Sequence, residues 1–182
     1  MPLLTDMKKN IAYKTALGAI LCALAVALNF LEGLLPAMPF LPPGAKPGLS
    51  NIITMFAAGS LGLPQALIIA LVKGGFTFVS RGAAASAMSL AGGLLSAFAG
   101  WLLLRYGEKL FGLVGISVIC SLCHNLGQLL VSVMITGSKN TFYYAPFLAL
   151  FGLASGILTG IIFRAVMPAL EKQKKHFYKF DN

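Results

Sequence analysis

Six apolar segments separated by short turns constrain this chain more than any other feature. They cover residues 11–35, 49–63, 65–79, 84–104, 113–135 and 142–167, and glycine, proline or charged residues occupy the turns between them. About twenty apolar residues in a helix cross the hydrocarbon core of a bilayer. Charged residues make up only 10% of the chain, against about 25% in soluble domains. The sequence therefore predicts an all-α bundle of six transmembrane helices in a multi-pass protein of the cell membrane.

The distribution of basic residues predicts the topology of this bundle. We expect one transmembrane domain over residues 11–168, a tail over residues 1–10 and a basic tail over residues 169–182. With six crossings, ten Lys and Arg residues fall on the side of both termini and three on the other. That asymmetry predicts cytoplasmic termini, and it explains the net charge of +9 without a nucleic-acid partner. Segment 49–63 is short, so its full crossing stays open.

Polar side chains gather on one face of the fifth segment. At 3.6 residues per turn they form a stripe of Ser117, Ser121, His124 and Gln128, with Asn125 and Ser132 beside it. Lipid cannot satisfy such groups, so the stripe must face other helices or a wet cavity. One interpretation is the wall of a binding cavity. The other is a hydrogen-bonded seam that only holds helices together.

Three basic residues can join this stripe. Lys73 lies inside the third segment, where a charge is costly and usually faces a cavity or a partner, unless the side chain extends to the surface. Arg81 and Lys46 lie on the predicted outer side, either beside the cavity or as interfacial anchors. Together the three cations suit an anionic ligand, a carboxylate or a phosphate. The proline-rich loop 36–47 is apolar apart from Lys46, and it can cover the bundle as a lid.

Catalytic signatures are missing from the sequence. The chain has no phosphate-binding loop of the ATPase type and only five acidic residues, none of them paired. Cys120, Cys123 and His124 spell a haem-attachment motif, but it lies in an apolar helix, and we interpret the cysteines, with Cys22, as reduced packing residues. We therefore expect no catalytic site, no metal and no cofactor.

Small residues mark one face of the first segment. Alanines recur at Ala12 and Ala16, and again at Ala19, Ala23 and Ala27. Such a stripe lets another helix approach closely. That helix can belong to the bundle itself or to a partner protein.

Three stretches of sequence resemble a known family. They are residues 46–52 (KPGLSNI), 89–96 (SLAGGLLS) and 124–129 (HNLGQL). On these motifs, and over roughly residues 12–168, the chain resembles the Gx transporters, also called heptaprenyl diphosphate synthase component I. That family is similar to the substrate-binding S components of energy-coupling factor (ECF) transporters.

The resemblance implies a six-helix subunit that captures a small molecule at its outer face. Its partners would be a transmembrane coupling protein and two ATPases, with the coupling protein docked on Ala19, Ala23 and Ala27, or on Ala12 and Ala16. Substrate would bind beneath the loop 36–47, against helices four to six. An isoprenoid or vitamin-like ligand is compatible with the family's names.

Residues and resemblance together predict a transport subunit that is not an enzyme. Its predicted substrate-binding residues are His124, Asn125, Gln128, Lys73, Arg81, Lys46, Asn51 and Ser121. The first alternative is a membrane subunit or anchor of a heptaprenyl diphosphate synthase. The second is a self-contained secondary carrier, which the scarcity of acidic residues disfavours.

Overall fold

Helices make up all the secondary structure among residues 2–34, 46 and 48–178, which are the residues that the computed structural model describes. The elements in chain order are α1 (Pro2–Leu34), α2 (Asn51–Ser60), α3 (Leu63–Arg81), α4 (Ala83–Tyr106), α5 (Glu108–Thr136), the 3-10 helix η1 (Lys139–Tyr144) and α6 (Ala145–Tyr178). The predicted all-α class is confirmed. The predicted lid, residues 36–47, lies outside the described residues except for Lys46.

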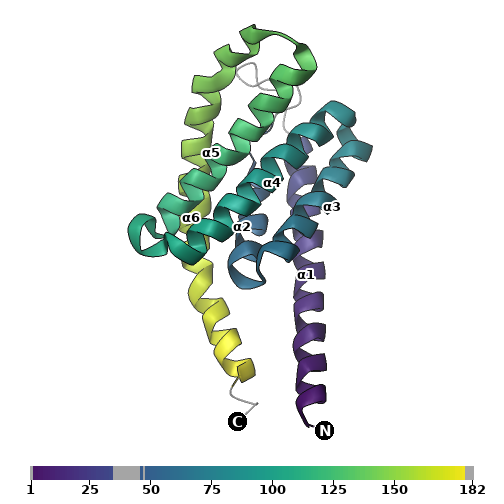
Figure 1. The fold of residues 1–182 in the computed structure, drawn as a ribbon, viewed down its shortest axis with the longest axis vertical. Coiled ribbons are helices and arrows are strands. Elements are labelled where there is room, and N and C mark those ends of the chain that lie inside the picture. Colours follow the sequence, from purple (N-terminus) through teal and green to yellow (C-terminus); the bar gives the residue numbers. More distant parts are fainter. Residues whose placement is uncertain (1, 35–45, 47, 179–182) are drawn as a thin grey trace.

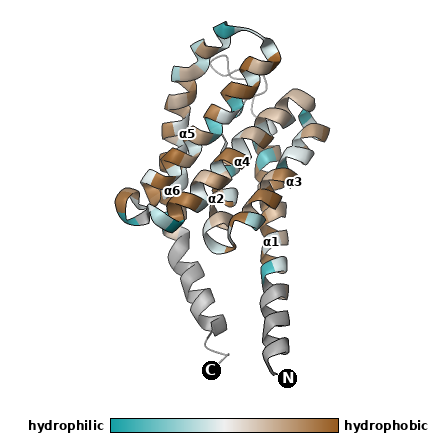
Figure 2. Ribbon diagram, viewed as in Figure 1, coloured by the Kyte–Doolittle hydropathy of each residue, from teal (hydrophilic) through white to brown (hydrophobic). Residues whose placement is uncertain are grey.

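In the described part of the chain, five helices are long and apolar enough to cross a membrane. These spans are Lys14–Leu34, Leu63–Arg81, Ala83–Tyr106, Lys109–Thr136 and Lys139–Ala165. Large apolar side chains cover their outer faces, among them Val79, 85% exposed, and Met134, 80% exposed. Figure 2 shows hydrophobic residues along these helices and hydrophilic residues at the α4–α5 and α5–α6 turns. So much exposed apolar surface is unfavourable in water and favourable in lipid. The chain is therefore a multi-pass membrane protein.

The second predicted crossing is shorter in the structure than in the sequence analysis. Helix α2 has ten residues and spans about 15 Å, roughly half the hydrocarbon core. Glycines with positive φ flank it, Gly48 at 83° and Gly62 at 96°, and other residues rarely adopt that conformation. Six full crossings are therefore not confirmed. Both termini nevertheless lie at one end of the bundle (Figure 1), and their cytoplasmic placement stays a prediction.

Helix boundaries differ from the predicted ones mainly at the chain ends. Helix α1 begins at Pro2 and α6 continues to Tyr178, so helix includes most of both predicted tails. Within α5, Gly112 has non-helical angles, and the long helical stretch begins after it, where the sequence predicted the fifth segment to begin.

Helix α2 lies at the centre of the apolar core. Its buried residues Met55, Phe56 and Ala57 belong to one cluster with buried side chains from α1, α3, α4, α5 and α6. Phe56 meets Phe163 of α6 edge to face, with ring centroids 6.1 Å apart. Because five helices surround α2, its N-terminal end is held in a fixed place inside the bundle.

Glycines bring α4, α5 and α6 into close contact. A Cβ on Gly127 of α5 would lie 2.7 Å from the backbone nitrogen of Gly92 in α4. A Cβ on Gly156 or Gly160 of α6 would lie 2.6–2.7 Å from a backbone Cα of α5. The helices therefore approach to the limit set by their backbones, which fixes the orientation of the polar face of α5.

Candidate functional site

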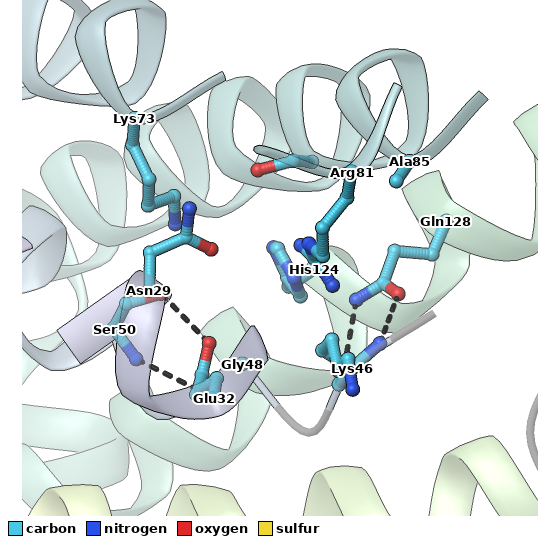
Figure 3. Close-up of a pocket in the computed structure, with 11 residues that line it drawn as sticks. Asn29, Glu32, Lys46, Gly48, Ser50, Lys73, Arg81, Ala85, His124 and Gln128 are labelled. Atoms are coloured by element: carbon cyan, nitrogen blue, oxygen red, sulfur yellow. Dashed lines mark hydrogen bonds between the residues drawn. The ribbon is translucent and has the colours of Figure 1, made fainter. Parts of the chain in front are cut away.

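A small pocket lies where α1, α3, α4 and α5 meet the segment before α2 (Figure 3). It leaves room for roughly one water molecule. Eleven described residues line it: Asn29, Glu32, Lys46, Gly48, Ser50, Lys73, Arg81, Ala85, Ser89, His124 and Gln128. None of them belongs to α6, although the resemblance implied a site built by helices four to six. Arg81 lies at the α3–α4 turn, which is at the end of the bundle opposite the termini (Figure 1). The pocket therefore lies toward that end.

Three cations and one carboxylate line this pocket. Lys73 and Arg81 lie eight residues apart on one face of α3, and both side chains extend toward the centre of the pocket (Figure 3). Lys73 is only 1% exposed, and its ammonium donates a hydrogen bond of 2.7 Å to Asn51 Oδ1. Lys73 therefore does not extend to the surface. The pocket therefore brings together the three cations that the sequence analysis grouped, Lys46, Lys73 and Arg81.

Glu32 of α1 holds the N-terminal end of α2. Its carboxylate accepts hydrogen bonds from the backbone N–H of Ser50 and from the Ser50 hydroxyl, both 3.1 Å long. Ser50 precedes α2, and its own side chain forms no capping bond. A carboxylate is stabilised at this end of a helix by the helix dipole. Glu32 thus fixes Ser50 at the start of α2 and places a negative charge beside the cations.

The sequence analysis did not include Glu32 or Asn29 among the site residues. Asn29, three residues before Glu32 on α1, donates a 2.8 Å hydrogen bond to Thr77 Oγ1, and Thr77 in turn donates to the Lys73 carbonyl. The available signal was the presence of Asn29 and Glu32 one helical turn apart in an apolar segment. Such a pair at membrane depth indicates a polar interior.

The predicted polar stripe of α5 contacts two different parts of the bundle. All its members are buried, but only His124 and Gln128 line the pocket. Ser121 shares a 2.7 Å hydrogen bond with Ser155 of α6, and Asn125 donates one of 2.7 Å to the Leu148 carbonyl. One part of the stripe therefore borders the pocket, and the other part, with Ser121 and Asn125, forms an α5–α6 seam. That the pocket binds a ligand stays a prediction.

The Gln128 side chain forms two hydrogen bonds with the backbone of Lys46. Its Oε1 accepts a hydrogen bond of 3.1 Å from the Lys46 N–H, and its Nε2 donates one of 3.2 Å to the Lys46 carbonyl. Figure 3 shows this pair at the edge of the pocket. Burial lowers the pKa of the Lys46 ammonium, the nearby Arg81 lowers it further, and Glu32 opposes both effects. Lys46 therefore lies within the electrostatic reach of both charged neighbours.

Several polar atoms at the pocket have no hydrogen-bond partner among the described residues. They are Nε and Nη1 of Arg81, Nδ1 of His124 and, beside the pocket, Nδ2 of Asn51. Buried polar atoms without partners are costly, and each requires an explanation, such as a bound water, ion or ligand. In the same described part of the chain, no three His, Cys, Asp or Glu side chains are grouped as metal ligands would be.

Gly48 packs directly against the pocket. A Cβ at this position would lie 2.9 Å from Asn51 Nδ2 and 2.9 Å from His124 Cδ2, and the residue has a φ of +83°. We expect Gly48→Ala to destabilise the protein by about 1–3 kcal/mol, because it adds backbone strain and an overpacked contact. The midpoint of thermal unfolding in detergent measures this loss.

Gly82→Ala is the matched control. Gly82 has a φ of +87°, and nothing lies within 4 Å of an added Cβ, so this variant carries the strain without the contact. Gly48→Ala should be the less stable of the two. Equal midpoints would contradict the close packing of Gly48 against His124.

The alanine stripe of α1 faces outward. Ala19, Ala23 and Ala27 are exposed, whereas Leu21 and Ala25 belong to the buried core on the other face. Ala12 and Ala16 are exposed as well. In the bundle these alanines are therefore accessible to lipid or to another protein.

Comparison with known proteins gives two similarities. The family model described as heptaprenyl diphosphate synthase component I matches residues 21–166. A solved structure described as the S component of a bacterial ECF transporter superposes with a TM-score of 0.67 at 19% sequence identity, covering 90% of this chain and 98% of that one. No curated protein matches the chain. The family match confirms the resemblance found in the sequence motifs, and the second similarity, at this identity, establishes a shared fold.

Proposed function

This chain belongs to the family described as heptaprenyl diphosphate synthase component I, and from its S-component fold we propose that it is a substrate-binding subunit of an ECF-type transporter. It captures a small anionic molecule in the pocket between α1, α3, α4 and α5. A separate module, made of a transmembrane coupling protein and ATPases, drives the uptake. The chain itself catalyses no reaction.

The charged pocket carries this proposal. Three cations and Glu32 line a space inside a bundle whose outer faces are apolar. Ionisable groups at membrane depth are expensive and usually mark a path or a site for a polar substrate. Lys73, Arg81, Lys46, His124 and Gln128 all line this space, which supports their proposed role. Asn51 bonds to Lys73 and acts through it.

Gentle purification from the native membrane tests the proposed partnership. The full chain is extracted in mild detergent, and the proteins that come with it are identified by mass spectrometry. We expect one coupling membrane protein and ATPase subunits. Recovery of a soluble prenyl synthase subunit without any ATPase would instead support a membrane anchor of that enzyme, the alternative that the family's description favours.

The exposed stripe of α1 is the proposed docking surface for the coupling protein. Because close helix contact requires small side chains, Ala23→Leu should reduce the recovery of ATPase subunits about tenfold or more, the equivalent of roughly 1.4 kcal/mol. Ala154→Leu on α6, also at an exposed alanine, should leave recovery unchanged. Quantitative mass spectrometry of the two variants measures this. Unchanged recovery with Ala23→Leu places the docking surface elsewhere.

A further inference from the structure

The pocket has an excess of positive charge. Among the described residues of the lining, Lys46, Lys73 and Arg81 are formally positive and Glu32 is the one carboxylate. With a neutral histidine, the described lining therefore has a formal excess of two positive charges. Uncompensated charges inside a membrane bundle are costly. A group with two negative charges, brought by a ligand, balances this excess better than a group with one.

The pocket also offers hydrogen-bond donors in excess of acceptors. Arg81 presents Nε and Nη1, both buried and without a partner among the described residues. The Lys73 ammonium carries three donors, of which one points to Asn51 Oδ1. Guanidinium and ammonium donors make their strongest hydrogen bonds to charged oxygens, and Arg matches the geometry of carboxylate and phosphate groups in particular.

The size of the pocket favours a compact group. The enclosed space takes roughly one water molecule, so the lining has to move outward for either kind of anion. A phosphate group carries both charges on one centre and requires less movement than the two carboxylates of a dicarboxylate, which carbon atoms separate. Two long side chains of the lining, Lys46 and Arg81, are only partly buried.

We infer that this pocket binds a phosphate group, the compact dianionic part of the substrate, with Arg81 and Lys73 as its main partners. The inference rests on the proposed function, because it names the chemical class of substrate for the same pocket. Ala85 is the only residue of the described lining with an apolar side chain. Any carbon chain attached to the phosphate therefore extends outside this part of the pocket.

Titration calorimetry on the purified full chain in detergent tests the inference. The probes are inorganic phosphate, methyl phosphate, geranyl phosphate, acetate and succinate. We expect the phosphate compounds to bind about tenfold or more tightly than acetate and succinate. Geranyl phosphate binding more tightly than methyl phosphate identifies an isoprenoid source, and equal affinities identify a small phosphate ester. Acetate or succinate binding as tightly as inorganic phosphate overturns the inference.

Two variants connect the binding to the pocket. Arg81→Gln should weaken phosphate binding about tenfold or more, since it removes the positive charge and the charge-assisted hydrogen bonds of the guanidinium. Arg105→Gln is the matched control and should bind as the wild type does. Arg105 is exposed and stacks on Trp101 and Tyr106, 5.9 and 5.7 Å from their ring centroids. Equal affinity in the Arg81 variant overturns the inference.

Glu32→Gln provides a test of opposite sign that does not depend on the folding of the Arg81 variant. Glutamine retains an acceptor for the Ser50 N–H, but it removes the negative charge that repels a phosphate. Phosphate should therefore bind more tightly, by several-fold, and unchanged or weaker binding contradicts the inference. The assay contains no ATPase. If phosphate does not bind but the ATPases are still recovered with the chain, the inference fails and the proposed function stands. If phosphate binds but no ATPase is recovered, the inference stands and only the ATPase partnership fails.

Discussion

Gly127→Ala is expected to disrupt the contact between α4 and α5 and to lower the stability of the bundle by about 3 kcal/mol. The added Cβ would lie 2.7 Å from the Gly92 nitrogen, 2.8 Å from the Gly92 Cα and 2.9 Å from the Ala91 carbonyl carbon. All three are backbone atoms, so no side-chain rotation relieves the contact and the helices have to separate. The midpoint of thermal unfolding in detergent measures the loss.

Gly75→Ala controls for the substitution itself. Gly75 is an exposed glycine inside α3, and nothing lies within 4 Å of its added Cβ. Alanine is the better helix former, so this variant should match the wild type or exceed its stability by up to about 1 kcal/mol. If Gly127→Ala proved as stable as Gly75→Ala, the two helices would not cross as closely as described.

Lys73→Met is expected to remove anion binding and to destabilise the bundle by about 1–3 kcal/mol, the cost of an unsatisfied buried polar group. Methionine retains much of the side-chain volume but removes the ammonium, which leaves Asn51 Oδ1 without its donor. It also leaves Glu32 in the same pocket with one cation fewer. Chemical denaturation and phosphate titration of the same purified protein measure the two effects. Lys139→Met, at an exposed lysine, is the control and should change neither.

Adding Glu32→Gln to Lys73→Met separates charge balance from packing. If Glu32 and Lys73 interact directly, the loss of stability in the double variant should be smaller than the sum of the losses in the two single variants, because each single change already removes their interaction. Phosphate binding should stay weak, since the main cation is still missing. A double variant with the summed losses of both single variants would show that the two charges do not interact.

The membrane character of the fold was readable from the sequence because hydropathy over about twenty residues is a local property. The third to sixth segments were predicted within a few residues, apart from the extension of α6 beyond residue 167. Helix α2 was harder to predict. Its sequence is as apolar as its neighbours, and its short length comes from the backbone angles of Gly48 and Gly62, which composition does not reveal.

The site was predictable only as far as helix geometry extends. Helical spacing placed Ser121, His124 and Gln128 on one face of α5, and all three are buried. It did not say which neighbour each would meet, and that decides whether a residue lines the pocket or the α5–α6 seam. The role of Glu32 was beyond reach for the same reason: its contact with Ser50, eighteen positions away, exists only once α2 is in place.

The pairing of Gln128 with residue 46 uses only main-chain groups of that residue. Any amino acid except proline has the same backbone N–H and carbonyl, so these two hydrogen bonds do not depend on the side chain at position 46. A substitution at position 46 would therefore leave both hydrogen bonds to Gln128 in place. In the proposed transport subunit, such a substitution would change the charge at the edge of the pocket and leave the attachment of this segment to α5 intact.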